Sequence, residues 1–166
     1  MKKLFLSLVC AAFTLAAGAQ QKWAYQADFN EGRACVKDAS GKWGYIDASG
    51  KVISPCKWRS NYYYQEGMGR VINDDEKYGY LDLDGNEVIP CQFEFGGFFS
   101  EGLAAVAIRE DYSTKYGYID KTGKIVIPCQ WENAYSFSDG TAKVEVKLDD
   151  GQRVWKKINK AGKYVE

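Results

Sequence analysis

The sequence predicts an all-β protein built from four tandem units of about 35 residues, each a three-stranded antiparallel ribbon. Three observations support this: a set of aromatic and glycine spacings recurs four times, short stretches alternate with period two, and a hairpin-turn signal closes every copy. A three-stranded ribbon cannot cover its own apolar face, so we expect neighbouring units to stack into an open twisted array. A small closed, propeller-like array is the alternative, although 35 residues is short for a propeller blade.

The first element of each unit is an aromatic residue nine positions before a glycine that has an acidic neighbour. A second aromatic lies three residues before the glycine, and a valine lies four residues after it. The four copies of aromatic, aromatic, glycine and valine are Trp23, Phe29, Gly32 and Val36; Trp58, Tyr64, Gly67 and Val71; Phe93, Phe99, Gly102 and Val106; and Trp131, Phe137, Gly140 and Val144. Chance does not produce this spacing four times, so the chain is a repeat protein.

The second element is the segment Lys-Trp-Gly-Tyr-Ile-Asp at 42–47, with a turn and then a Pro-Cys step after it. Close variants stand at 77–82 and 115–120, and a degenerate one stands at 154–159. The Pro-Cys steps are Pro55-Cys56, Pro90-Cys91 and Pro128-Cys129. Beginning each unit at the cysteine position gives units 21–55, 56–90, 91–128 and 129–166.

Within the first unit, the alternation predicts strands over 33–37, 42–47 and 51–54. The last two are joined by the turn Asp47-Ala48-Ser49-Gly50, where Asp accepts backbone hydrogen bonds and Gly takes a positive φ. The same turn recurs at 82–85, 120–123 and 159–162. Since proline has no backbone donor, each proline is expected to end its strand or to lie on a sheet edge.

The aromatic residue of the Lys-Trp-Gly-Tyr segment is predicted to be the core anchor of its unit, its ring lying over bare glycine backbone. The predicted anchors and their glycines are Trp43 and Gly44, Tyr78 and Gly79, Tyr116 and Gly117, and Trp155 without a glycine.

These motifs, Lys-Trp-Gly-Tyr-Ile-Asp above all, make the chain resemble the WG-repeat proteins of bacteria. The resemblance covers the whole of 20–166 and implies a repeat architecture without implying a particular reaction. It departs in the fourth copy, where Lys156 and Lys157 replace Gly and Tyr. The full geometry of the last unit is therefore an open question at the level of sequence.

The N-terminal segment is predicted to be an export signal. Lys2 and Lys3 form its charged end, an apolar stretch follows, and Ala17-Gly18-Ala19 supplies small residues before a cleavage site. We expect residues 1–19 to be removed, leaving a single repeat domain over 20–166 in the periplasm or outside the cell. No later segment is apolar enough to span a bilayer.

Composition excludes several chemistries. The chain has no histidine, which removes Ser-His and Cys-His nucleophile pairs and His-based zinc sites. Its 22 basic and 22 acidic residues cancel, which argues against a nucleic-acid partner. We therefore expect no catalytic residue, no cofactor and no bound metal; a hydrolase with paired carboxylates is a distant third hypothesis.

Two motifs invite a metal or redox interpretation. Cys56, Cys91 and Cys129 occupy equivalent positions a repeat apart, so we expect small buried apolar residues, with a disulfide to Cys35 or a metal site as alternatives. The segment 82–86 resembles the start of a calcium loop but lacks a Glu at loop position 12. We interpret it as a turn.

The aromatics outside the repeated positions are the candidates for function. They are Tyr25, Tyr62, Tyr63, Phe95, Phe98, Tyr112 and Tyr135, and they form either extra core or an exposed strip for a partner. Insertions at 109–114 and 148–153 are predicted to enlarge one loop in units three and four. We expect a secreted, non-enzymatic protein-interaction surface or scaffold at the cell envelope, with a glycan-binding module as the alternative.

Overall fold

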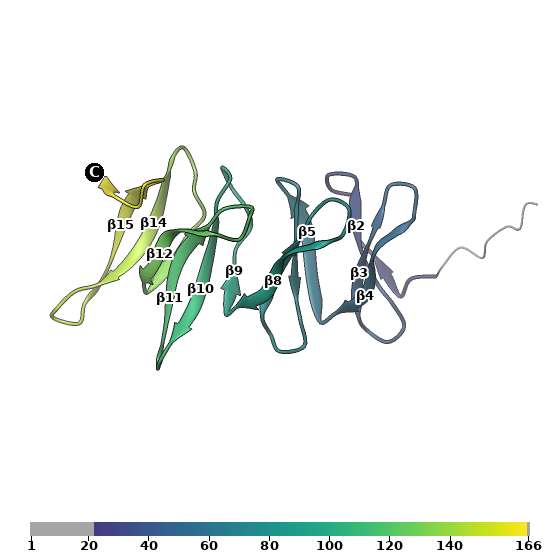
Figure 1. The fold of residues 1–166 in the computed structure, drawn as a ribbon, viewed down its shortest axis with the longest axis horizontal. Coiled ribbons are helices and arrows are strands. Elements are labelled where there is room, and N and C mark those ends of the chain that lie inside the picture. Colours follow the sequence, from purple (N-terminus) through teal and green to yellow (C-terminus); the bar gives the residue numbers. More distant parts are fainter. Residues whose placement is uncertain (1–21, 166) are drawn as a thin grey trace, which may run out of the picture.

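The computed structural model describes residues 22–165, which form sixteen β-strands in four antiparallel sheets of four strands each. The sheets stand in a row along the long axis of the molecule, and the first and last lie at opposite ends (Figure 1). The fold class is therefore confirmed: an all-β, open repeat array. The predicted leader at 1–19 lies outside the described residues.

In every sheet the strands follow one another in chain order. The first sheet contains β1 (Tyr25–Gln26), β2 (Arg33–Lys37), β3 (Trp43–Asp47) and β4 (Val52–Trp58), and the second contains β5 (Ser60–Gln65), β6 (Met68–Ile72), β7 (Tyr78–Leu81) and β8 (Glu87–Phe93). The third contains β9 (Phe95–Gly96), β10 (Ala104–Glu110), β11 (Ser113–Ile119) and β12 (Ile125–Trp131), and the fourth contains β13 (Asn133–Ala134), β14 (Thr141–Lys147), β15 (Arg153–Asn159) and β16 (Tyr164–Val165).

The predicted hairpin turns form as expected. The N–H of Gly50 donates to the carbonyl of Asp47 at 2.9 Å, and the Asp47 carboxylate accepts from the N–H groups of Ser49 and Lys51 at 2.9 and 3.0 Å. Asp82 does the same for its own turn, accepting from the N–H groups of Asp84 and Asn86. The segment at 82–86 is thus a hairpin turn whose leading carboxylate is occupied by the backbone.

Each unit has four strands rather than the three predicted, because a further strand precedes the first one that the alternation revealed; it has two residues in units one, three and four and six residues in unit two. The proline also lies inside its strand: β4 passes through Pro55 and ends at Trp58. Tyr45 pairs with Ser54 but Trp43 pairs with Trp58, so Pro55 to Lys57 form a bulge on the edge strand of the sheet. Each of the first three sheets consequently ends three residues beyond the unit boundary drawn from the sequence.

Each junction between neighbouring sheets contains an equivalent, fully buried tyrosine from the third strand of the preceding sheet. Tyr45, Tyr80 and Tyr118 are buried and pack against apolar residues of the following sheet, such as Val71 and Leu81 at the first junction. Their hydroxyls donate across the junction to the carbonyls of Tyr62, Gly97 and Tyr135 at 2.7, 2.7 and 2.8 Å. The ring supplies apolar burial and the hydroxyl fixes the offset of the next sheet.

The predicted anchors Trp43, Tyr78 and Tyr116 are only half-buried, and Trp155 is 44% exposed. In the first three units the buried anchor is instead the tyrosine two residues later in the chain. The glycine between the two aromatics makes room for the bulged edge strand, rather than for an aromatic ring as predicted. At Gly79 an added Cβ would lie 2.7 Å from the Ile89 carbonyl oxygen and 2.8 Å from the Cys91 nitrogen. A side chain there would push the edge strand away.

The fourth sheet keeps the pairing of the others, with Ala142 opposite Ile158 as Ala34 is opposite Ile46. Its outer face differs: Lys157 stands where the other units have the buried tyrosine and is exposed. A polar outer face is what a terminal sheet of a stacked array requires.

The two insertions do not enlarge irregular loops. They lengthen the strands on either side, so that the β10–β11 and β14–β15 hairpins project beyond the body of the array (Figure 1). Tyr112 lies at the tip of the first of these hairpins and is fully exposed.

Candidate binding surface

Ten aromatic side chains form a strip along the side of the array where the first strands β1, β5, β9 and β13 lie. The members of this aromatic strip are Tyr25, Trp43, Tyr62, Tyr63, Tyr78, Phe95, Phe98, Tyr116, Tyr135 and Trp155. Equivalent positions of stacked units lie in a row, which is why residues far apart in sequence meet here. The strip contains the predicted candidates except Tyr112, together with the four predicted anchors.

The middle of the strip is continuous across the second junction. Tyr78 and Phe95 have ring centroids 5.6 Å apart, and Phe95 and Tyr116 are also 5.6 Å apart. Tyr63 stacks on Phe98 at 4.5 Å, with the planes 18° apart. Tyr63 remains 50% exposed, so this cluster is anchored on one side and open on the other.

Arg70 lies inside this cluster as a buried cation without a carboxylate partner among residues 22–165. Its guanidinium carbon lies 3.7 Å from the ring centroid of Tyr62 and 4.0 Å from that of Phe98. One Nη donates to the Gly96 carbonyl at 2.8 Å, while Nε has no partner among the described residues. Burial lowers the pKa of Arg70, but a guanidinium stays charged at neutral pH and is stabilised here by the two ring faces.

The C-terminal end of the strip is a stacked pair. Tyr135 and Trp155 lie 4.8 Å apart with their planes only 8° from parallel. Tyr135 is 57% exposed, which makes this pair the most accessible part of the strip. Tyr112 makes no ring contact with another aromatic residue of the described chain and is not part of the strip.

The cysteines take no part in this surface. Cys56, Cys91 and Cys129 are half-buried in the edge-strand bulges rather than fully buried as predicted, and Cys35 is buried; all four are free thiols. Burial raises the pKa of Cys35 to about 11, of Cys91 to about 12 and of Cys129 to about 11, so these thiols are protonated at neutral pH. Within 22–165, no group of three or more Cys, Asp or Glu side chains could hold a metal ion.

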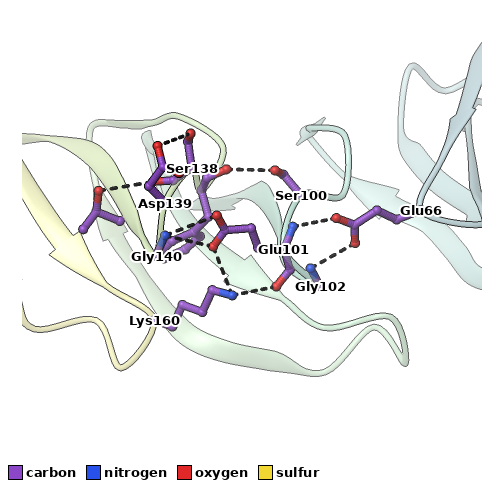
Figure 2. A network of polar contacts seen from close by, with 10 residues as sticks. Glu66, Ser100, Glu101, Gly102, Ser138, Asp139, Gly140 and Lys160 are labelled. Atoms are coloured by element: carbon purple, nitrogen blue, oxygen red, sulfur yellow. Dashed lines mark hydrogen bonds and ion pairs between the residues drawn. The ribbon is translucent and has the colours of Figure 1, made fainter.

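Glu31, Glu66 and Glu101 form what we call the carboxylate ladder. It lies along the edge of the array that contains the turn between the first and second strands of each sheet. The Glu31 carboxylate accepts from the N–H groups of Glu66 and Gly67 at 2.9 and 2.8 Å. Glu66 in turn accepts from Glu101 and Gly102 at 2.6 and 3.0 Å, and Glu101 accepts from Gly140 (Figure 2). In units one to three, the acidic residue that precedes the repeat glycine therefore caps the turn of the next unit.

The ladder predicts an acid-sensitive component of stability. Burial raises the pKa of Glu66, but the backbone hydrogen bonds and Lys121 outweigh it and leave the pKa lowered; Lys160 and then Gly140 lower the pKa of Glu101. A lowered folded-state pKa stabilises the fold above the unfolded value of about 4.3, and this stabilisation is lost as pH falls through the folded-state pKa. The thermal midpoint should therefore fall as pH drops below about 4.3.

The matched variant for this prediction is Glu66→Gln/Glu101→Gln. It should be less stable than the parent at pH 7 and lose less stability on acidification, since only a carboxylate titrates there. Thermal melts followed by circular dichroism between pH 7 and pH 3 measure both effects. An unchanged difference between the two proteins across that range would show that the ladder does not titrate with folding.

The roles of two sets of residues at these surfaces were not predicted from the sequence. Arg70 stands at a position held by Cys35, Ala105 and Lys143 in the other units, so its failure to recur was the available signal. Glu31, Glu66 and Glu101 were visible as the acidic neighbours of the repeat glycines. Their inter-unit hydrogen bonds were not foreseeable, because the stacking offset between sheets determines them.

The comparison with family models identifies the repeat. The model for the WG containing repeat matches three stretches, residues 43–76, 78–110 and 116–147. Each stretch begins at the half-buried aromatic of the Lys-Trp-Gly-Tyr segment, namely Trp43, Tyr78 or Tyr116. No curated protein matches the chain.

No helix long and apolar enough to cross a membrane occurs among residues 22–165.

Proposed function

The chain belongs to the WG-containing repeat family, and from this premise we propose that it is a secreted, non-enzymatic repeat protein whose aromatic strip binds a protein partner at the bacterial cell envelope. The observation that carries the proposal is the exposure of Tyr63, Tyr135 and Trp155 beside junctions whose cores are already filled by other tyrosines. Folding does not require these rings to be placed there. Tyrosine, tryptophan and arginine are the residues enriched where binding energy concentrates.

The strip is preorganised for binding. Tyr63 is held against Phe98, Tyr62 against Arg70, and Tyr135 against Trp155, all on a sheet scaffold. A partner that docks on these rings immobilises few additional side-chain torsions, which lowers the entropic cost of association.

A protein partner suits this surface better than a glycan. A sugar ring stacks on an open aromatic face, whereas the two most exposed pairs use one face of each ring on one another, at 18° and 8° between planes. The accessible surface of these pairs combines ring edges and the outer ring faces, with backbone and charged groups beside them. That is the composition of a protein-binding patch with a polar rim.

The test is site-specific photocrosslinking in envelope preparations. A photoreactive phenylalanine derivative is placed at Tyr63 or Tyr135 on the strip, or at Ser49 on the opposite, ladder-bearing edge as the matched control. We expect one discrete protein adduct from both strip positions and none from Ser49. Adducts of equal yield from Ser49, or adducts to saccharide alone, would contradict the proposal.

Substitution of the strip provides the second arm. Tyr63→Ser and Tyr135→Ser should leave the thermal midpoint within a few degrees of the parent, since both side chains are half-exposed. They should weaken capture of the crosslinked partner about tenfold or more, as loss of an aromatic anchor does. Tyr112→Ser alters an exposed ring outside the strip. It therefore distinguishes binding by the strip from binding by the projecting β10–β11 hairpin. If the strip substitutions unfold the chain, the rings are core and the proposal is wrong.

A further inference from the structure

A cavity of about 210 Å³ opens on the strip at the first junction, between the first and second sheets. Aromatic rings form most of its wall: Tyr25, Trp43, Tyr45, Tyr62, Tyr63 and Tyr64. Its volume is below the 300 to 1,000 Å³ typical of small-molecule sites. The cavity therefore suits a single side chain rather than a whole cofactor or drug-sized ligand.

The second junction shows what such a space holds. Cys35, which lines the cavity, pairs with Tyr45 in the first sheet, and Arg70 pairs with the equivalent Tyr80 in the second. Ala27, also in the wall, stands five residues before its repeat glycine, where unit two has Tyr62. At the second junction, the Arg70 guanidinium and the Tyr62 ring fill this space. At the first junction, the small residues Cys35 and Ala27 leave it open.

The walls that hold the Arg70 guanidinium also have counterparts around the cavity. Phe98 covers one face of the guanidinium, and Tyr63 occupies the equivalent position, four residues before its glycine, in the cavity wall. Arg70 donates to the carbonyl of Gly96, whose equivalent is Asn61, and Asn61 also lines the cavity. The first junction thus contains one of the two aromatic walls of a buried arginine, and a polar residue at the acceptor position, without the arginine and without the second ring.

The polar groups around the cavity favour a cation. Asn61 is only 7% exposed and donates from Nδ2 to the Gly44 carbonyl at 2.7 Å, while its Oδ1 acceptor has no partner among the described residues. Asp28 lines the cavity and forms no ion pair within 22–165. Both groups are acceptors, so an entering cationic donor would gain hydrogen bonds and charge compensation.

The one basic residue in the wall is already engaged. Arg33 donates from Nε and Nη2 to the Leu83 carbonyl at 2.9 and 2.8 Å, and from Nη1 to the Glu31 carbonyl at 3.3 Å. Its guanidinium is thereby directed toward the ladder edge. Lys37 lies over the Trp43 ring, 5.3 Å from its centroid, but does not line the cavity.

We infer that this cavity is a receptor slot for an arginine side chain of the protein partner, stacked on Tyr63 as Arg70 is stacked on Phe98 at the next junction. Arginine is favoured over lysine because a planar guanidinium stacks on an aromatic face while its edge donates several hydrogen bonds. Tyr63 supplies the stacking face, and Asn61 and Asp28 accept hydrogen bonds. The inference deepens the proposed function by naming one side chain that the strip recognises.

The test uses a small probe, so that it can fail while the crosslinking experiment succeeds. Nα-acetyl-L-arginine N-methylamide is titrated into the isotopically labelled protein, and the indole N–H resonance of Trp43 is followed by NMR. The matched control probe is the citrulline counterpart, which has nearly the same shape without the charge. We expect saturable shifts with the arginine probe and at least about tenfold weaker binding of citrulline, the loss expected for one cation–π contact and one charge pair.

Two variants locate the site. Asp28→Asn changes an exposed residue and should weaken the arginine probe several-fold without altering the thermal midpoint. Ala27→Tyr/Cys35→Arg reproduces the filled second junction and should abolish the Trp43 shifts, because the slot is then occupied from within. Equal binding of citrulline, no response of Trp43, or full binding by Asp28→Asn would each overturn the slot. A crosslink from Tyr63 would in that case still support the strip as the partner surface.

Discussion

Replacing Tyr80 with alanine is expected to lower the free energy of unfolding by about 3–5 kcal/mol, the range for removing a large side chain from a core. Tyr80 is only 1% exposed and packs with Ile89, Phe99 and Val106 between the second and third sheets. Its ring lies 5.0 Å from that of Phe99 and its hydroxyl donates to the Gly97 carbonyl at 2.7 Å. The substitution therefore removes a core ring and a hydrogen bond between sheets together.

Tyr78→Ala is the matched control, since Tyr78 lies on the same strand and the same face but is half-buried. It should cost less than about 2 kcal/mol, because a partly exposed ring loses less apolar burial. Urea unfolding of both variants, followed by tryptophan fluorescence, measures the difference. If Tyr78→Ala proves the more damaging, the first aromatic of the Lys-Trp-Gly-Tyr segment is the anchor after all and the burial argument is wrong.

The second large effect is expected at a turn glycine. Gly85 and Gly50 occupy equivalent turn positions with φ of 83° and 84°, which asparagine tolerates better than other non-glycine residues. Their surroundings differ. A Cβ at Gly85 would lie 2.2 Å from the Ile53 carbonyl oxygen of the preceding sheet, whereas a Cβ at Gly50 meets nothing within 4 Å.

Gly50→Asn should therefore change stability by no more than about 1 kcal/mol, while Gly85→Asn should cost at least about 2–3 kcal/mol because backbone must move. Thermal and urea unfolding of the two single variants provide the comparison. Equal stabilities would mean that the second sheet can shift away from Ile53 without penalty. The turn conformation alone would then govern both positions.

Much of the fold could be predicted from local patterns. The strand at 33–37, the hairpin turn at 47–50 and the proline on a sheet edge are all present, because period-two alternation, Asp-x-x-Gly turns and the missing donor of proline act within a few residues. The short strands β1, β9 and β13 could not be predicted, since two residues are too few to show alternation.

The candidate surface was only partly predictable. Tyr63 and Tyr135 are exposed as the partner hypothesis requires, whereas Phe95 and Phe98 are half-buried among the rings of the strip. Trp155 was predicted to be core and is exposed. Only its contacts with the Tyr62 and Phe98 rings distinguish Arg70, because a single charged residue in a strand has no periodic signature.

The amino-acid sequence by itself determined that this chain is a stack of four β units, because the residues that form turns, strands and glycine bulges act through their own neighbours and recur at fixed spacing. The tertiary structure alone decided which aromatic of each Lys-Trp-Gly-Tyr segment is buried. Trp43 and Tyr45 lie two residues apart on one face of a strand, so alternation treats them alike. The offset of the next sheet covers Tyr45 and leaves Trp43 at the edge, beside the slot.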